Sequence, residues 1–334
     1  MNEAPMPASP LSDADRQLVD AVLAGQRRAL AKAITLIEST RADHQQRSQD
    51  VLTALLPQTG RAIRLGISGV PGAGKSTFIE ALGVWLIERG KKLAVLAVDP
   101  SSTLTGGSIL GDKTRMEQLS QREEAFIRPS PSAGSLGGVA EKTREAMLLC
   151  EAAGYDVIII ETVGVGQSET TVAGMVDLFC LLQLPNAGDD LQAIKKGIVE
   201  IADLVAINKA DIDPQATAVT RAQWRNALHL LRPASKHWTP PVLALSALHK
   251  EGIAEFWAQV EQYQAALQPT GEFAAKRQHQ ALAWMWQLIE SGLHRHFRQH
   301  PRVQEHLPAF TRSVEAGHTT PAAAAYALLD DLKH

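Results

Sequence analysis

The sequence predicts an α/β fold in which helices cover a mostly parallel β-sheet on both faces. Short stretches of strand-forming residues recur along the chain, and stretches with helical spacing separate them. The strand stretches are apolar throughout, which is typical of strands buried on both faces of a sheet. Strands that alternate with helices favour parallel pairing through crossover helices. The stretches are IRLGIS, KLAVLAVD, DVIIIE, LFCLLQL, LVAIN and PVLALS.

The chain divides into three predicted parts. Residues 1–60 form a helical N-terminal extension, because apolar positions recur at helical spacing and Pro57 and Gly60 close the last helix. Residues 61–267 contain the strands and form the sheet domain. Residues 268–334 form a helical C-terminal arm. Its large apolar side chains either pack on the core of the chain itself or form a dimer surface.

The composition of the 334 residues is that of an ordinary globular protein, with 45% hydrophobic and 21% charged residues. A formal net charge of −3 argues against a protein that coats nucleic acid or binds an anionic membrane. The N-terminal stretch does not resemble a signal peptide, and no apolar run is long enough to span a bilayer. Cys150 and Cys180, without CxxC spacing, favour a reducing compartment. We therefore expect a cytoplasmic protein that binds neither nucleic acid nor membrane.

The first strand runs directly into a glycine-rich loop that matches G-x-x-x-x-G-K-[ST] and precedes a helix. Because Gly72 and Gly74 lack a Cβ, the backbone can curl and point its N–H groups at phosphate oxygens. The helix that begins near Lys75 adds partial positive charge, Lys75 can reach the β- and γ-phosphates, and Ser76 can bind Mg²⁺. A nucleoside-triphosphate site is therefore expected. Its predicted residues are Gly69, Val70, Pro71, Gly72, Ala73, Gly74, Lys75, Ser76 and Thr77.

Three carboxylates follow strands or lie in the loops after them. Asp99 ends the second strand, where it either caps a helix or holds water on a metal, and Asp112 lies in the Gly/Ser/Thr-rich loop beyond it. Glu161 ends the strand DVIIIE, where P-loop enzymes carry a second carboxylate for Mg²⁺, and it reaches the metal directly or through water. Gly164 matches the glycine whose N–H meets the γ-phosphate. The predicted metal ligands are Ser76, Asp99, Asp112 and Glu161.

The residue after Gly164 is Val165, so the glutamine that orients the attacking water in Ras-type enzymes is missing at this position. Isolated hydrolysis is therefore expected to be slow and to be completed by another segment, subunit or partner. Residues 185–197 are a candidate segment, because they leave the carboxyl edge of a strand, where ligands gather. Lys195 and Lys196 in this segment either act there or form a solvated helix face.

Two loops indicate which base is bound. The strand LVAIN ends in Asn208, Lys209 and Asp211, and a carboxylate at Asp211 can accept hydrogen bonds from both N1 and the 2-amino group of guanine. Adenine would leave that carboxylate facing a lone pair, at a cost of about 2–3 kcal/mol. Asn208 would tie the loop to the purine edge, and the stem of Lys209 would cover the base. The strand PVLALS then offers the backbone N–H groups of Ser246, Ala247 and Leu248 to guanine O6.

Taken together, these motifs resemble those of the MeaB/ArgK family. The members of this family are P-loop GTPases of the SIMIBI class that associate with methylmalonyl-CoA mutase. The resemblance covers nearly the whole chain. The phosphate loop and NKAD are generic, whereas ETVGVGQSE and GDDLQAIKKGI are specific to the family. The stretches that carry the resemblance are GVPGAGKST, AVDPSS, GDKTRM, ETVGVGQSE, GDDLQAIKKGI and NKAD.

The resemblance implies a homodimeric, Mg²⁺-dependent GTPase that hydrolyses GTP to GDP and phosphate. It implies a chaperone that binds methylmalonyl-CoA mutase, gates the loading of adenosylcobalamin, and protects or reactivates the mutase. Residues 99–112, 161–169 and about 185–196 would be three switches, with Lys195 relaying partner-stimulated hydrolysis, and the C-terminal arm would form the dimer. The implied catalytic residues are Lys75, Asp112, Glu161 and Lys195.

Two other functions stay open at this point. One is a GTP- or ATP-dependent protein kinase acting on periplasmic amino-acid-binding proteins, although no base for a hydroxyl acceptor is evident in the sequence. The other is a metal-insertion GTPase for nickel enzymes, which shares the glutamate-bearing switch. The first 60 residues hold one histidine, His44, and no cysteine, and His294 and His296 point to different faces of a helix. Metal insertion is therefore disfavoured.

Overall fold

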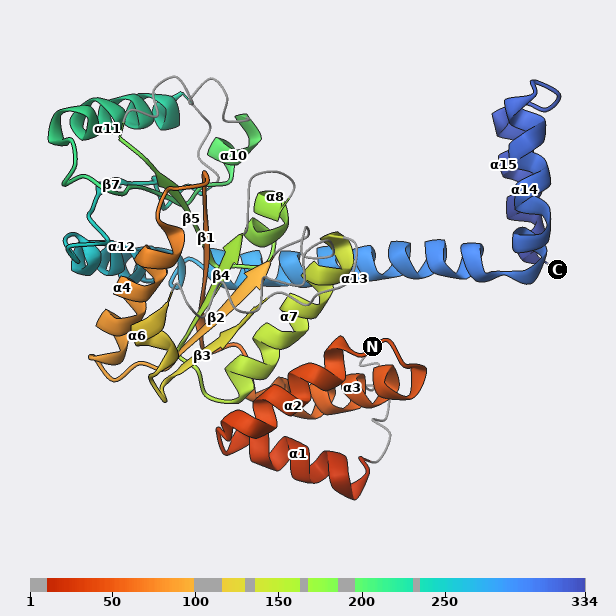
Figure 1. Cartoon of the computed structure of the whole chain (residues 1–334), viewed down its shortest axis with the longest axis horizontal. Helices are drawn as coiled ribbons and strands as arrows, with labels where there is room; N and C mark the ends of the chain where they lie inside the picture. The colour runs from red at the N-terminus through yellow and green to blue at the C-terminus, as the bar shows by residue number, and fades with distance from the viewer. Residues whose placement is uncertain are drawn as a thin grey trace. The chain divides into compact units, whose positions relative to one another are not determined.

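The structure, a computed structural model, consists of two compact units, Met1–Phe273 and Ala274–His334 (Figure 1). The first unit contains the whole β-sheet, and the second is helical. The structure describes residues 11–98, 116–129, 136–162, 168–185, 196–230 and 235–333.

A seven-stranded, all-parallel sheet forms the centre of the first unit, with the strand order β3-β2-β4-β1-β5-β6-β7. The predicted α/β class is therefore confirmed. Sequence analysis missed β3, because this strand has only four residues and ends in an arginine. The strands are β1 (Ile63–Gly69), β2 (Leu93–Val98), β3 (Ala125–Arg128), β4 (Val157–Thr162), β5 (Leu178–Gln183), β6 (Leu204–Ile207) and β7 (Val242–Ala244).

Helices bury both faces of this sheet, and successive residues of each strand face opposite sides. Leu65 and Ile67 of β1 share a core with α4 and α12, in which the rings of Phe78 and Phe256 meet edge to face at 4.8 Å. Ile158 of β4 belongs to the core on the other face, with α7 and the N-terminal helices. The helices are α1 (Asp13–Leu23), α2 (Arg27–Glu38), α3 (Ala42–Leu55), α4 (Lys75–Ile87), α6 (Glu117–Ser120), α7 (Leu136–Ala152), α8 (Ser168–Ala173), α10 (Lys196–Glu200), α11 (Pro214–His229) and α12 (Ile253–Leu267), with a 3₁₀ turn at η1 (Leu56–Gln58).

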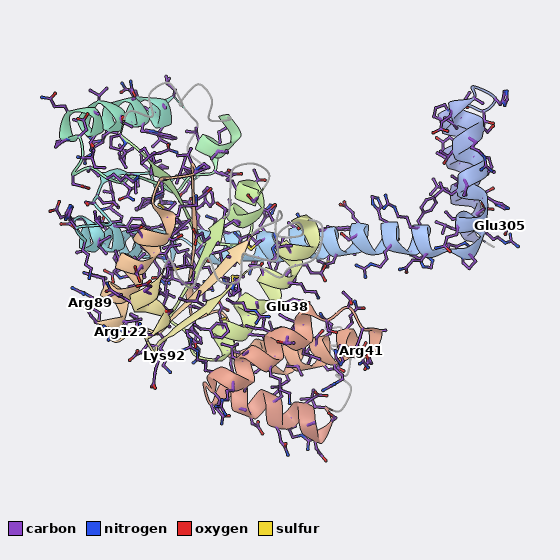
Figure 2. The ribbon with its side chains drawn as sticks, viewed as in Figure 1. Glu38, Arg41, Arg89, Lys92, Arg122 and Glu305 are labelled. Carbon is purple, nitrogen blue, oxygen red and sulfur yellow. The ribbon has the colours of Figure 1, made fainter. Side chains whose placement is uncertain are left out.

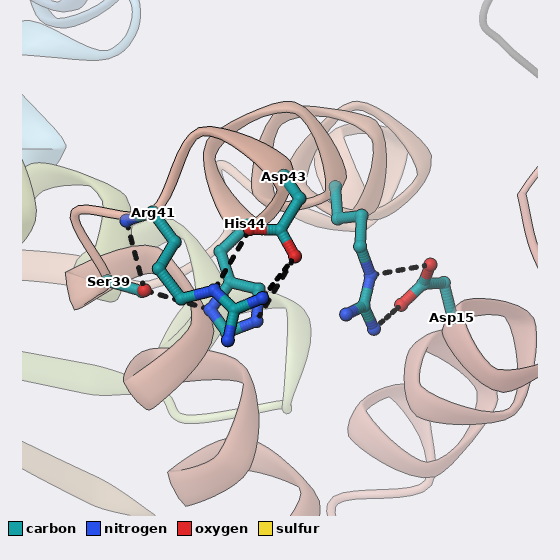
Figure 3. Close-up of polar contacts among 6 residues, drawn as sticks. Asp15, Ser39, Arg41, Asp43 and His44 are labelled. Carbon is teal, nitrogen blue, oxygen red and sulfur yellow. Dashed lines mark hydrogen bonds and ion pairs between the residues drawn. The ribbon is translucent and has the colours of Figure 1, made fainter.

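The N-terminal helices α1, α2 and α3 share a hydrophobic core with α7 and the sheet. A partly buried polar contact joins α1 to α3, in which the exposed Arg47 donates two hydrogen bonds, of 2.7 and 3.2 Å, to the buried carboxylate of Asp15. These hydrogen bonds hold the pKa of Asp15 below its usual range. Figure 3 shows this pair and, beside it, the exposed pair of Arg41 and Asp43. The N-terminal helices are thus joined to one another and to the sheet by a shared apolar core, and the Arg47–Asp15 pair adds a polar contact between α1 and α3.

Glu38 and Arg89 are among the charged side chains labelled in Figure 2. Glu38 at the end of α2 forms an ion pair with Arg128 of β3, which adds a polar tie between the N-terminal helices and the sheet. Arg89, just beyond α4, places its guanidinium 3.5 Å from the centroid of the Trp85 ring. A cation at this distance from an indole face is attracted by the ring quadrupole.

A buried ion pair lies at the amino-terminal edge of the sheet, away from the phosphate loop. Arg64 of β1 donates hydrogen bonds of 2.8 and 3.1 Å to Glu151 of α7, whose side chain is fully buried. Glu151 also accepts a 2.6 Å hydrogen bond from the Gly60 N–H. The backbone N–H of Arg64 donates to Asp177, which precedes β5. These contacts join the start of β1 to α7 and to the residue that precedes β5.

In the second unit, α14 (Pro301–Glu315) and α15 (Pro321–Asp330) pack together, followed by the 3₁₀ turn η2 (Asp331–Lys333). Val303 and Leu328 are the large apolar residues buried between them. Helix α13 (Glu272–Gln299), most of which belongs to this unit, has no buried residue. Its exposed large apolar residues are Leu282, Met285, Trp286, Leu288, Ile289 and Leu293.

Within the residue ranges that the structure describes, none of the helices combines the length and the hydrophobicity that crossing a membrane requires.

Replacing Glu151 with Ala should lower the free energy of unfolding by about 3–5 kcal/mol, because the guanidinium of Arg64 would stay buried without its charge partner. Urea denaturation followed by circular dichroism measures this change. As a control, Asp13→Ala removes the partner of Arg16 from a pair with 61% and 92% exposed side chains. That change should lower the free energy of unfolding by less than about 0.5 kcal/mol. If the two variants lose equal stability, the buried pair has no special role in the fold.

Candidate functional site

The glycine-rich loop joins β1 to α4, and α4 begins at Lys75 as predicted. Gly72 and Gly74 have φ angles of 82° and 83°, in the left-handed region that favours glycine. A Cβ at Gly74 would also lie 2.6 Å from Nδ2 of Asn208. Glycine is therefore required at residue 74 both by the backbone angle and by the close approach of a second loop.

The amine of Lys75 is held against the loop that precedes it. Its Nζ donates a 2.8 Å hydrogen bond to the carbonyl oxygen of Gly69 and lies 3.5 Å from that of Val70. A positive charge at the first residue of α4 adds to the partial positive charge of the helix N-terminus. The combination of backbone N–H groups, helix dipole and amine suits a bound polyphosphate.

The carboxylate of Glu161 lies beside the phosphate loop. Strand β4 pairs with both β1 and β2, and Glu161 is in register with Ile67 and Ala97. Glu161 is 5% exposed, and its Oε1 accepts a 3.3 Å hydrogen bond from the hydroxyl of Ser76. Two oxygens from separate elements thus lie next to each other, and oxygen is the ligand type that a hard cation such as Mg²⁺ prefers.

The next residue of β4 is also tied to the phosphate-loop strand. The hydroxyl of Thr162 donates a 2.9 Å hydrogen bond to Oγ of Ser68, and both side chains are fully buried. Sequence analysis did not single out this pair, because no local pattern connects residues that lie 94 positions apart. Together with the contact between Glu161 and Ser76, it fastens the end of β4 to β1.

Four predicted site residues lie outside the described part of the chain. Asp99 and Asp112 lie in the sequence between β2 and α6, Gly164 lies between β4 and α8, and Lys195 precedes α10. Their assigned roles remain predictions. The ends of β2 and β4 are described, and both strands end at the same edge of the sheet as β1.

Asn208 connects the phosphate loop to the loop after β7. Its Nδ2 donates a 2.8 Å hydrogen bond to the carbonyl oxygen of Ala73, and its Oδ1 accepts one of 2.9 Å from the N–H of Ala247. The side chain is buried, with 2% of the residue exposed. Sequence analysis expected the Ala247 N–H to face guanine O6, whereas in the structure it donates to Asn208. The partners are 39 and 135 residues from Asn208, which leaves no local sequence signal.

Asp211 lies next to the same loop. A hydrogen bond from Ser246 lowers the pKa of this carboxyl, and the basic side chains of His249 and Lys209 nearby lower it further. Asp211 is therefore ionised at neutral pH and able to accept hydrogen bonds. Lys209 has a φ of 61°, and the side chain of Leu248 is mostly exposed at 74%. Sequence analysis did not consider His249, whose Nε2 lies 3.6 Å from Oδ2 of Asp211.

The described site residues all follow β1, β4, β6 or β7 at the carboxyl edge of the parallel sheet. Ligands of open α/β sheets bind at this edge. The order along it is the oxygen pair of Glu161 and Ser76, the glycine-rich loop, and the loop of Asp211, with Asn208 linking the last two. This arrangement can hold a nucleotide by its phosphates at one end and by its base at the other.

Comparison with known proteins identifies the family. The family model described as methylmalonyl-CoA mutase-associated GTPase MeaB matches residues 30–302. GTPase ArgK of Escherichia coli K12 is 54% identical over 273 residues, which are 81% of this chain and 82% of that protein. The mitochondrial methylmalonic aciduria type A homolog of Mus musculus is 48% identical over an alignment 338 positions long, which covers 97% of this chain and 81% of that protein.

A solved structure supports the same assignment. The crystal structure of a protein described as LAO/AO transport system kinase superposes with a TM-score of 0.78 at 40% identity. The match covers 98% of this chain and 100% of that one. Since the family model spans most of the sequence and the parallel sheet carries its phosphate loop in the expected place, the chain belongs to the MeaB family of P-loop GTPases.

Proposed function

We propose that this GTPase is a chaperone of methylmalonyl-CoA mutase. In this proposal it gates the loading of adenosylcobalamin onto the mutase and protects or reactivates it. The description of the matching family model as mutase-associated carries the proposal. The 48% identity to a methylmalonic aciduria type A homolog over nearly the whole chain supports it.

The nucleotide is proposed to be GTP, held along the carboxyl edge of the sheet. Lys75 and the N–H groups of the glycine-rich loop would bind the β- and γ-phosphates. Asp211 would accept hydrogen bonds from N1 and the 2-amino group of guanine, and its lowered pKa keeps it ionised for that purpose. Because the N–H groups of Ser246 and Ala247 already donate to the Glu251 carbonyl oxygen and to Asn208, we expect Leu248 to supply any backbone contact to guanine O6.

Mg²⁺ is proposed as the metal. The oxygens of the partly buried Ser76 and the buried Glu161, 3.3 Å apart, fit its preference for oxygen ligands, and Asp99 and Asp112 are further candidates. When bound, the ion would neutralise charge on the β- and γ-phosphate oxygens. Glu161 and Ser76 would hold it beside the phosphate loop, and Lys75 would add a further positive charge toward the same phosphate oxygens.

Hydrolysis is proposed to need help from the partner. Val165 stands where Ras-type enzymes carry the glutamine that orients the attacking water. A site that binds the phosphates and metal but lacks this group should hydrolyse GTP slowly in isolation. Lys195, in the segment after β5, is our candidate for relaying the effect of the mutase.

A homodimer is proposed to form through α13. Leu282, Met285, Trp286, Ile289 and Leu293 recur at spacings of three and four residues, so they form one stripe along the helix. All five are exposed by 40% or more. A stripe of this kind on a helix without buried residues is typical of a helix that packs on another helix. A second copy of the chain would supply an identical stripe.

A second candidate function is transfer of phosphate to a protein. The similarity to the protein described as LAO/AO transport system kinase favours it. A kinase would need a side chain that accepts the proton of the acceptor hydroxyl, and sequence analysis found none. Regulation of the mutase therefore remains the better supported proposal.

Replacing Lys75 with Ala should weaken GTP binding by roughly 100-fold or more, because hydrogen bonds between charged groups contribute about 1.5–3 kcal/mol each. Equilibrium titration with a fluorescent GTP analogue measures the affinity. Lys91→Ala removes an exposed lysine after α4 and should leave the affinity unchanged. If Lys75→Ala binds GTP as well as the unsubstituted protein does, the phosphate site is misplaced.

GTP hydrolysis by the isolated protein should be slow, with a turnover on the order of 10⁻³ s⁻¹, and should rise at least about tenfold when methylmalonyl-CoA mutase is added. Radiolabelled GTP follows the reaction, and the label should appear as inorganic phosphate. The Lys75→Ala variant, mixed with GTP and the mutase in the same way, measures the background rate of hydrolysis. Fast turnover that the mutase does not change would contradict the partner-completed mechanism, and label on an added binding protein would favour the kinase.

Replacing Trp286 with Asp should convert a dimer into a monomer, because a charge at the centre of the stripe would be buried in the interface without a partner. Sedimentation equilibrium measures the mass in solution. Leu230→Asp changes a side chain that is 88% exposed in the first unit and should not alter the mass. The α13 interface is wrong if the Trp286→Asp protein retains the mass of the unsubstituted one.

A further inference from the structure

His249, in the turn after β7, brings an imidazole close to the carboxylate proposed to bind guanine. Its Nε2 lies 3.6 Å from Oδ2 of Asp211. The imidazole is 56% exposed and the carboxylate 22% exposed, so both are accessible to a ligand and to protons. The distance is longer than a hydrogen bond but within the range of an ion pair when the imidazole is protonated.

The position of His249 follows from a rigid turn. The backbones of Ser246 and Glu251 exchange two hydrogen bonds of 3.0 Å, and the N–H of His249 donates to Oγ of Ser246 at 3.3 Å. The loop of Asp211 is joined to this turn by the N–H of Ala210, which donates to the Leu245 carbonyl oxygen at 3.1 Å. The imidazole is therefore held near Asp211 by the backbone of both loops.

The charges around the pair identify which group can respond to pH. Lys209 lies on the loop of Asp211, and Lys250 and Glu251 follow His249 in its own turn. Asp213, at the start of α11, is engaged in capping that helix through the Ala216 N–H at 2.8 Å. Histidine is the side chain whose charge ordinarily changes between pH 5 and 8. Among these described residues, His249 is therefore the one whose residue type responds to pH in this range.

A carboxylate offers about four lone-pair sites. Ser246 uses one site of Asp211, and guanine would use two through N1–H and the 2-amino group. A protonated imidazole would occupy the remaining site and compensate the charge of the carboxylate. Charge-assisted hydrogen bonds are stronger than neutral ones, so a compensated carboxylate is a weaker acceptor for guanine.

We propose that His249 is a positioning residue of the guanine site that makes nucleotide affinity depend on pH. When the imidazole is neutral, it does not pair with the Asp211 carboxylate, and guanine binds there fully. When the imidazole is protonated, it pairs with the carboxylate and weakens base binding. Affinity for GDP and GTP falls as the pH falls through the ionisation of the imidazole, and nucleotide binding in turn favours release of that proton. The inference rests on the proposed role of Asp211.

The test is the affinity for N-methylanthraniloyl-GDP between pH 8.0 and 5.5, measured by fluorescence titration of the full chain. The terminal phosphate of the nucleotide ionises in this range as well, so His249→Gln supplies the baseline. The unsubstituted protein should lose about two- to fivefold more affinity than His249→Gln over this interval, as for a partly exposed ion pair. His237→Gln, which removes another histidine paired with a carboxylate, should follow the unsubstituted profile.

His249→Asn is a second variant in case the glutamine perturbs the turn, and thermal unfolding checks both. Parallel pH profiles for the unsubstituted protein and the His249 variants would overturn the inference. Asp211→Asn separates the two proposals. If it loses GDP affinity while the His249 profiles run parallel, only the inference about His249 fails. If it binds GDP normally, the assignment of the guanine site fails first.

Discussion

The position of β4 between β1 and β2 is the constraint on which the proposed site depends. Parallel pairing on both sides brings the ends of these three strands to one edge, with Glu161 in register with Ile67 of the phosphate-loop strand. The contacts of Glu161 with Ser76 and of Thr162 with Ser68 then fasten the end of β4 to β1 and α4. A one-residue slip would turn Glu161 to the opposite face of the sheet, and the two oxygens proposed to bind Mg²⁺ would no longer face each other.

Asn208 extends this arrangement toward the base end of the site. By bonding to Ala73 and Ala247, its amide joins the phosphate loop to the loop after β7, and the close approach leaves no room for a Cβ at Gly74. The phosphate and base ends of the site therefore share one buried side chain. A movement of either loop would disturb a hydrogen bond of the other, which offers a physical route by which the nucleotide state could be communicated along the edge of the sheet.

Several features of the fold were predictable because their signals are local. Uninterrupted apolar stretches predicted six of the seven strands, and the glycine, lysine and serine spacing placed the phosphate loop between β1 and α4. The alternation of strands and helices predicted parallel pairing. Strand β3 was missed because four residues are too few to show a periodic pattern. Its strand conformation depends on pairing with β2, which its own sequence does not predict.

The sequence by itself determined the fold class, the phosphate loop and the anionic loop at Asp211, because each depends on residue types at short fixed spacings. Tertiary structure decided which distant groups meet. The bonds from Asn208 to Ala73 and Ala247, the contact of Ser76 with Glu161, and the approach of His249 to Asp211 join residues that are 38 to 135 positions apart. The order of strands in the sheet determines which of these distant residues come into contact, and strand order depends on the packing of the whole core.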